Sequence, residues 1–242
     1  MNTVKKYVIK FVRKLGYDIV RFRPKTHPLA RRIRILEAYR VDHIIDIGAN
    51  VGQYGLELRE IGYRGRISSF EPLSSAYTLL HSRASRDNLW DTYNFALGDK
   101  IESAVINIAA NSYSSSILDM LPSHIKSAPA SEYTGSQAIK VKTLDSIFTD
   151  LCSQSKRVYL KIDTQGFEKN VLIGAEQSLS SINTIQLEMS LTPLYKDELT
   201  LMEMYNFLYE KGFALIAVEP GFTDKETGRL LQLDGIFHRM RE

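Results

Sequence analysis

Residues 43–60 read HIIDIGANVGQYGLELRE, and this stretch predicts a strand, a glycine turn and a helix in succession. After His43, three isoleucines surround Asp46, which is the pattern of a strand buried on both faces. A carboxylate within such an apolar run is costly unless a partner satisfies it. The stretch therefore predicts a polar site built around a buried strand.

The turn after this strand is rich in glycine. Gly48 and Gly52 flank it, and apolar residues then recur at roughly helical spacing until Gly62. A glycine turn between a strand and a helix lets a ligand approach the backbone and presents free N–H groups. A turn without any ligand is the alternative interpretation.

The spacing around the turn indicates which ligand to expect. Asp46 begins an Asp-x-Gly-x-x-x-Gly pattern, which differs from the Gly-x-Gly-x-x-Gly fingerprint of dinucleotide-binding proteins. The next predicted strand, residues 66–70, runs into Glu71, where a carboxylate can accept both ribose hydroxyls of an adenosine cofactor. No glycine array for a pyrophosphate accompanies it, so adenosine without a diphosphate fits better than NAD. This combination indicates S-adenosylmethionine (SAM).

Composition indicates an ordinary soluble globular chain of one domain, or one domain with an extension: 242 residues, 44% hydrophobic and 24% charged. A single cysteine, Cys152, rules out internal disulfides and suits a reducing compartment. The sequence has no run of about 18 apolar residues, so we predict no membrane span. The basic N-terminus lacks the apolar core of a signal peptide. We expect a cytoplasmic protein.

Positive charge is concentrated in the first 40 residues, where twelve Lys and Arg face two acids. That segment carries +10, which leaves −7 for the rest of a chain of net charge +3. Residues 3–15 (TVKKYVIKFVRKL) form an amphipathic helix with its cations on one face. Such a helix can lie on an anionic membrane surface, at the inner face of the membrane, or pack its apolar stripe on the domain. We expect no nucleic-acid binding, because no basic groove with interleaved aromatic residues accompanies the charge.

We divide the chain into a helical extension over residues 1–42 and a domain over residues 43–242. Asp91–Leu97 is a predicted third strand, whose end would lie near the adenine of SAM. Residues 102–143 interrupt the alternation of strands and helices with two antiparallel strands and a long polar loop between them, the usual sign of a lid or binding loop. Tyr113 and the serines that follow it can bind a polar substrate; His124 is more simply a surface histidine.

Residues 158–179 repeat the strand–turn–helix pattern. Lys161 and Asp163 share one face of the strand, and an unpaired lysine in a central strand is rarely tolerated. Asp163 follows the strand's carboxyl end, where open α/β sheets bind ligands. Glu188, on the next predicted strand, can stand close to either residue; a purely structural ion pair is the alternative. Glu168 has a sufficient explanation as an acid in the first turn of a helix.

The remaining pattern is a helix over residues 197–211 and two strands joined by a loop, which pair antiparallel. We therefore predict an α/β fold of the Rossmann-like class I methyltransferase type. It has a mostly parallel seven-stranded sheet, an antiparallel last strand and helices on both faces.

Seven blocks covering about residues 43–240 resemble the FkbM-type methyltransferase family. They are IIDIGANVGQ, SSFEPL, NFALGD, VKTLDSI, YLKIDTQGFEKNVLIGA, QLEMSLTPLY and LDGIFHR. The resemblance implies SAM-dependent methyl transfer, typically to a hydroxyl of a sugar or polyketide. The resemblance does not cover the basic N-terminus or most of the loop over residues 110–138. It therefore does not identify the methyl acceptor of this chain.

The resemblance and the spacing together predict the site residues. By position, Asp46, Gly48 and Gly52 form the methionine-side loop, with Asn50 at the usual middle glycine, and Glu71 is the ribose acid. The predicted cofactor contacts are Asp46, Gly48, Ala49, Asn50, Gly52, Gln53, Tyr54, Glu71, Asn94, Phe95 and Ala96. The predicted substrate contacts are Tyr113, Ser115 and Tyr195.

For the chemistry, Asp163 is the predicted general base, Glu188 the second choice, and Lys161 their charge partner or a hydroxyl ligand. We predict no metal site, although a carboxylate pair could hold Mg²⁺. An NAD-dependent short-chain reductase is disfavoured, because no tyrosine has lysine four residues on. Alternatives that stay open are a polyketide or other small-molecule hydroxyl as acceptor in place of a glycan, and an inactive SAM-binding domain. The sequence also leaves the oligomeric state open.

Overall fold

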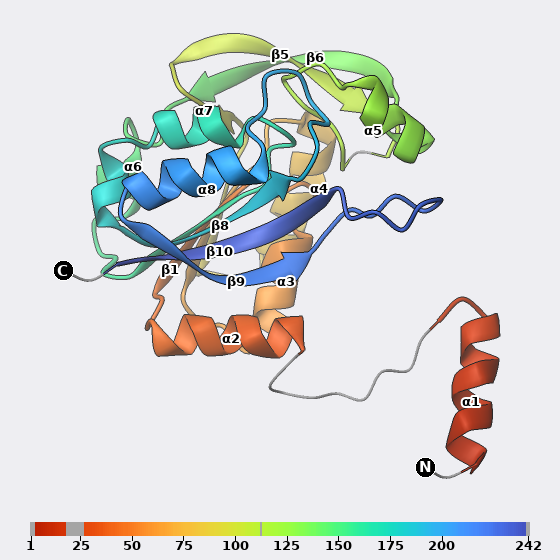
Figure 1. Cartoon of the computed structure of the whole chain (residues 1–242). Coiled ribbons are helices and arrows are strands. Elements are labelled where there is room, and N and C mark those ends of the chain that lie inside the picture. The colour runs from red at the N-terminus through yellow and green to blue at the C-terminus, as the bar shows by residue number, and fades with distance from the viewer. Residues whose placement is uncertain (1–2, 18–26, 112, 241–242) are drawn as a thin grey trace.

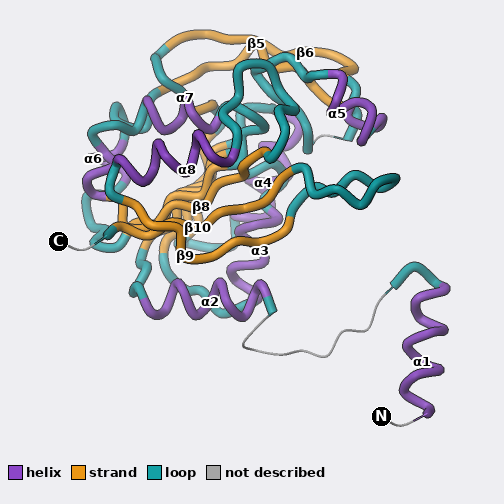
Figure 2. The backbone as a smooth tube through the Cα atoms, viewed as in Figure 1, coloured by secondary structure: helices purple, strands orange, loops and turns teal. Residues whose placement is uncertain are grey.

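The computed structural model describes residues 3–17, 27–111 and 113–240 (Figures 1 and 2). Seven strands form one sheet in the order β3-β2-β1-β7-β8-β10-β9. β10 runs antiparallel to both of its neighbours, and the other pairs are parallel, which confirms the predicted fold class. The strands are β1 (His43–Ile47), β2 (Arg66–Phe70), β3 (Trp90–Tyr93), β7 (Val158–Ile162), β8 (Ile182–Ser190), β9 (Phe213–Pro220) and β10 (Gln232–Arg239).

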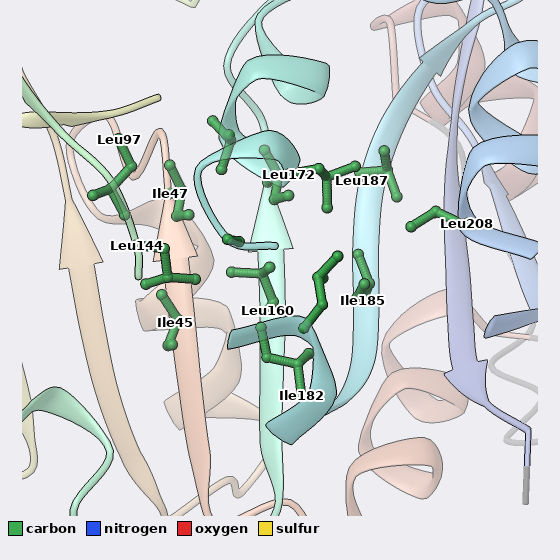
Figure 3. Close-up of a cluster of buried hydrophobic side chains, with 14 of the residues drawn as sticks. Ile45, Ile47, Leu97, Leu144, Leu160, Leu172, Ile182, Ile185, Leu187 and Leu208 are labelled. Atoms are coloured by element: carbon green, nitrogen blue, oxygen red, sulfur yellow. The ribbon is translucent and has the colours of Figure 1, made fainter. Parts of the chain in front are cut away.

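Helices cover both faces of this sheet because its central strands are apolar on both sides. In β1, Ile44 belongs to one hydrophobic cluster and Ile45 and Ile47 to the other, as the alternation of side chains along a strand requires. Figure 3 shows the second cluster between β1, β7 and β8. The first cluster lies under α2 (Pro28–Ala38), α3 (Gln53–Glu60) and α4 (Ser74–Ala84); the second lies under α6 (Phe148–Leu151), α7 (Glu168–Ile173) and α8 (Leu201–Glu210).

The predicted third strand is wrong in its extent, because the structure divides it between two sheets. β3 ends at Tyr93, and Ala96–Leu97 forms β4 in a separate sheet with β6 (Tyr133–Lys142). Between them, the Asn94 amide donates to the backbone carbonyls of Glu71 and Pro72, at 2.9 and 3.1 Å. These side-chain bonds hold the chain where it leaves the main sheet.

The predicted antiparallel pair within residues 102–143 is confirmed. β5 (Glu102–Ala109) pairs with β6, and the small sheet has the order β4-β6-β5. The connection between β5 and β6 carries α5 (Pro122–Ser127) and a 3₁₀ turn at Pro129–Ser131. In Figure 1 this small sheet lies above the end of the main sheet where β1 and β7 end.

The predicted helix over residues 197–211 begins later, after Thr200. The Thr200 hydroxyl and the carboxylate of Glu203 form a capping box that fixes this start. Glu198 lies outside the helix because its carboxylate accepts N–H groups of the preceding loop, including that of Tyr195 at 3.1 Å.

The segment before β1 is joined to the domain by α2. Leu36 is buried in the cluster beneath that helix. The buried Arg32 guanidinium donates to Glu219 of β9 at 2.7 Å and to Glu57 of α3 at 3.2 Å. The division at residue 42 stays a prediction, but α2 packs as part of the sheet's covering layer. α1 (Thr3–Lys14) is a helix, as predicted.

Candidate active site

The loop after β1 is shaped by residues in the left-handed region of backbone conformation. Gly48, Asn50 and Gly52 have φ values of 76°, 47° and 86°. A Cβ atom at Gly48 would lie 1.8 Å from the backbone carbonyl oxygen of Asp163, so only glycine fits where the loops after β1 and β7 meet. The N–H groups of Gly48 and Ala49 donate to the Phe70 carbonyl at the end of β2. The loop is thus fixed between two neighbouring strands.

Glu71 follows β2 and is buried against this loop. Its Oε2 accepts the N–H of Asn50 and its Oε1 the N–H of Leu73, both at 2.8 Å. Burial raises the pKa of Glu71 to about 7, and these two bonds oppose that shift. Each carboxylate oxygen keeps a second lone pair for a further donor.

The partner that Asp46 requires is Lys161. The two residues face each other in the register of β1 and β7, and the Lys161 Nζ lies 3.1 Å from Asp46 Oδ1. Ser69 Oγ donates to the other carboxylate oxygen at 3.1 Å. Lys161, which the sequence predicts as the charge partner of Asp163 and Glu188, therefore pairs with Asp46 first.

Lys161 also reaches Asp163, with Nζ 3.4 Å from Oδ2. Burial alone lowers the pKa of Lys161, but Asp46 and then Asp163 outweigh it and raise that pKa above its ordinary value. The lysine is therefore a permanent cation behind the site. Asp163 differs from Asp46 in exposure: 42% of its side chain is accessible, against none of that of Asp46.

Glu188 approaches Asp163 through a third residue, Gln165. The Gln165 Nε2 donates to Asp163 Oδ1 at 2.9 Å and to Glu188 Oε2 at 3.0 Å. The amide of Gln232 donates to the same Glu188 oxygen at 2.8 Å. The predicted gathering of Lys161, Asp163 and Glu188 therefore exists, with Glu188 joined by amides and not by the lysine.

Burial and the negative charge of Asp163 raise the pKa of Glu188 well above its ordinary value. The nearby acids Glu168, Asp234 and Glu198 raise the pKa further. Glu188 for this reason holds a proton more strongly than an ordinary glutamate, and Asp163 is the partly exposed carboxyl group beside it.

A cavity of about 260 Å³ opens at the carboxyl ends of β1, β2 and β7. Its volume is close to the lower end of the range of roughly 300–1,000 Å³ for ligand pockets. Nine predicted site residues line it: Gly48, Asn50, Gln53, Glu71, Ala96, Tyr113, Ser115, Asp163 and Glu188. Apolar walls come from Ile47, Phe70, Pro72, Leu73, Leu97, Ile106, Ile117 and Phe167.

Eight other predicted site residues are outside this lining: Asp46, Ala49, Gly52, Tyr54, Asn94, Phe95, Lys161 and Tyr195. Tyr54 points into the core, where its hydroxyl donates to Gln186 Oε1 at 2.9 Å. Phe95 packs its ring on Phe70 and Tyr93. The side chains of Tyr54, Asn94 and Phe95, predicted to contact the cofactor, are therefore not at the cavity wall. Each of them instead bonds to or packs against neighbouring residues of the fold.

Tyr195, a predicted substrate contact, is fully buried one layer behind the cavity. Its hydroxyl donates to Gln165 Oε1 at 2.9 Å, so it orients Gln165 and does not reach the cavity itself. The ring of His124 packs edge-on against Tyr195, and burial lowers the pKa of His124 to about 4. The interpretation of His124 as a surface histidine is wrong, because its side chain is buried.

Gln165 and Thr164 also line the cavity but were absent from the predicted site. The signal for Gln165 is its position, two residues after Asp163 at the carboxyl end of a buried strand. Its φ of 56° and its three side-chain partners depend on contacts between strands that one sequence does not display. Within residues 3–17, 27–111 and 113–240, no group of three or more His, Cys, Asp or Glu side chains is arranged to hold a metal ion.

Solved structures similar to this chain include the methyltransferase domain of bacterial CtHen1, with 10% identity, 89% of this chain and 100% of that chain covered, and a TM-score of 0.45. TehB from Haemophilus influenzae has 10% identity, 95% and 66% coverage and a TM-score of 0.47. LepI in complex with SAM has 12% identity, 98% and 53% coverage and a TM-score of 0.46. These scores are too low to carry an argument. No curated protein sequence matches this chain.

The family comparison is specific. The model of the methyltransferase FkbM domain matches residues 46–215, which is well over half of the chain. The match begins at Asp46 and includes Glu71, Lys161, Asp163 and Glu188, the polar residues whose geometry is described above. This chain therefore belongs to the FkbM methyltransferase family and is a SAM-dependent methyltransferase.

Proposed function

We propose that this chain transfers a methyl group from SAM to a hydroxyl of a sugar, in a cell-surface glycan or its precursor. The observation that carries the proposal is the position of Asp163. It is a partly exposed carboxylate at the wall of the cavity that also contains Glu71. A single cysteine supports a reaction in the cytoplasm.

The cavity fits SAM at several points. Glu71 has lone pairs left for the two ribose hydroxyls. Gln53 Oε1 is buried and has no hydrogen-bond partner among the described residues, and a donor on a bound ligand would satisfy it. Gly48 lines the cavity with backbone alone, and its lack of a Cβ lets the loops after β1 and β7 meet there. The apolar side chains of Phe70 and Leu97 suit the adenine ring.

The acceptor side of the cavity supports a polar substrate. Tyr113 is largely exposed at the wall, and Ser115 lies two residues further along the loop between β5 and β6. With Thr164 and Gln165 they provide hydroxyl and amide groups that can hydrogen-bond to a sugar. Ile106 and Ile117 give this side apolar contacts as well.

When bound, SAM supplies a methyl group already activated for transfer. The task of the protein is to align the acceptor and remove its proton. Alignment is worth about 7–11 kcal/mol where geometry is ideal, and a positioned base adds roughly 10²–10⁴-fold. Asp163 accepts the proton of the acceptor hydroxyl at its carboxylate. Gln165 holds that carboxylate from one side and Lys161 from the other.

Substitution of Asp163→Asn tests the role of the base. Turnover should fall by about 10²–10⁴-fold, while the Kd for SAM, measured by calorimetry, should change by less than about threefold, because Asp163 is placed on the acceptor side. Asp150→Asn is the matched control, since Asp150 is exposed on α6. Normal turnover in Asp163→Asn would contradict the assignment.

The acceptor class is tested separately by measuring S-adenosylhomocysteine release with two panels of compounds. One contains nucleotide sugars and simple glycosides, and the other contains polyketide and other small-molecule alcohols. Release with the first panel alone supports the proposal, and release with the second alone replaces it. SAM binding with neither methylation nor cofactor hydrolysis would favour an inactive domain.

A further inference from the structure

Three large apolar side chains of α1, and Leu15 just after it, are exposed. The exposed fractions are 71% for Tyr7, 48% for Val8, 64% for Phe11 and 60% for Leu15, which follows the helix. Figure 1 draws α1 apart from the sheet and from the helices that cover it. The sequence left two interpretations of this segment, a membrane-surface helix and a helix whose apolar stripe packs on the domain. The structure does not show the second arrangement.

The opposite face of α1 is basic. Lys5, Lys6, Lys10, Arg13 and Lys14 lie within Thr3–Lys14, and the helix contains no Asp or Glu. Lys6, Lys10 and Lys14 follow one another at intervals of four residues, so they form one row along the helix. α1 thus presents an apolar stripe on one face and a cationic row on the other.

Three kinds of partner can cover such a surface. A second copy of α1 would cover the stripe but would bring five cations next to five cations. A nucleic acid would neutralise the cations but leave Tyr7, Phe11 and Leu15 in water. An anionic phospholipid surface satisfies both features, because its headgroups are negative and its acyl region is apolar.

The length of α1 determines how it can lie on such a surface. Twelve residues span about 18 Å, short of the roughly 30 Å of a bilayer core. No helix in the described part of the chain is long and apolar enough to cross a membrane. An isolated helix of this length is also marginal in water, so burial of its stripe would stabilise it.

We propose that α1 binds flat on the surface of an anionic phospholipid bilayer. Tyr7, Val8, Phe11 and Leu15 enter the boundary between headgroups and acyl chains, and the lysines contact the phosphates. Each Lys or Arg near anionic lipid is worth about a fivefold factor in affinity, and this factor weakens as salt screens the charge. The inference does not rest on the sugar acceptor proposed above.

Co-sedimentation of the full chain with vesicles tests this binding. We compare phosphatidylcholine vesicles with vesicles containing 30% phosphatidylglycerol. The full chain should bind only the anionic vesicles, and 0.5 M NaCl should weaken that binding. Lys6→Gln with Lys10→Gln should reduce the affinity about 25-fold. Lys156→Gln with Lys225→Gln is the control of equal charge change, at exposed lysines of the domain, and should stay within about twofold.

Tyr7→Ser with Phe11→Ser separates the apolar contribution from the charge. Both side chains are exposed, so the domain should keep its thermal unfolding temperature while vesicle binding falls at least tenfold. Three outcomes would overturn the proposal. They are no binding to anionic vesicles, equal binding to both vesicle types, and a dimer in solution that Phe11→Ser dissociates. Duplex DNA is added as a competitor, and its affinity for the chain is measured with and without Tyr7→Ser and Phe11→Ser. If DNA displaces the chain from vesicles and the double variant binds DNA as tightly as the original chain, the cations are assigned to nucleic acid instead.

Discussion

Replacing Lys161 by methionine would leave the carboxylate of Asp46 buried without its cationic partner. Asp46 is fully inaccessible, and the ammonium nitrogen lies 3.1 Å from its Oδ1. The hydroxyl of Ser69 is a weaker partner that would remain. Breaking a buried pair on one side costs about 3–5 kcal/mol in the free energy of unfolding. At roughly 2–4 °C per kcal/mol for a chain of this size, Tm should fall by about 6–20 °C.

The matched control is Lys211→Met. Lys211 Nζ lies only 2.6 Å from Glu176 Oε1, a shorter distance than in the buried pair, but 65% of the Glu176 side chain is exposed. Exposed pairs are worth about 0–1 kcal/mol, so Tm should fall by less than about 4 °C. The comparison separates burial from distance as the source of the effect.

A double substitution tests the sign of the argument. Lys161→Met with Asp46→Asn has neither charge, so it should recover at least half of the stability that Lys161→Met loses. Differential scanning calorimetry and urea unfolding followed by circular dichroism give the two measures. A loss in Lys161→Met no larger than that in Lys211→Met would refute the reasoning, and so would a double variant less stable than the single one.

Two further predictions concern the cofactor side. The pKa of Glu71 is about 7, and ribose hydroxyls donate to its ionised form, so SAM affinity should be lost as pH falls through 7. About nine-tenths of Glu71 is ionised at pH 8 and about one-tenth at pH 6, which predicts a Kd about tenfold higher at pH 6 by calorimetry; a flat profile, or one unchanged in Glu71→Gln, would contradict this. Gly48→Ala should lose about 2–5 kcal/mol of stability, from the contact with the Asp163 carbonyl and the φ of 76°. Gly228 has a φ of 70° and open space around it, so Gly228→Ala should lose only the cost of the strained backbone, about 1 kcal/mol of stability. Equal losses in the two variants would show that the clash between a Cβ at residue 48 and the Asp163 carbonyl is relieved by a small shift of the chain.

The central strands β1 and β7 can be predicted from the sequence because each is a short apolar run followed by glycine or an acidic residue. The central pair is the clearest case. HIIDI and VYLKI each carry one charged residue at the fourth position, and the parallel register sets these positions side by side. The sequence pattern therefore contained the Asp46–Lys161 pair. Opposite charges at equal positions in two buried strands are a usable signal.

Other features depend on contacts that no local pattern displays. The chain leaves β3 at Tyr93 because Asn94 binds the carbonyls of Glu71 and Pro72, which belong to a different segment. Tyr54 follows the glycine loop closely, yet it faces the core and donates to Gln186, 132 residues later. Sequence position near a loop thus predicted proximity to the cofactor but not the direction of the side chain.

The two carboxyl groups at the cavity have separate roles because their partners differ in charge. Asp163 has an ammonium 3.4 Å from Oδ2, whereas Glu188 receives only neutral amides, from Gln165 and Gln232. Two neighbouring acids cannot both ionise cheaply, and the pKa of Glu188, the one without a cation, is raised well above its ordinary value. Gln165 suits this arrangement because its amide offers two N–H groups and no charge. A carboxylate at that position would place a third acid between the two, would repel both, and would offer no N–H group to either.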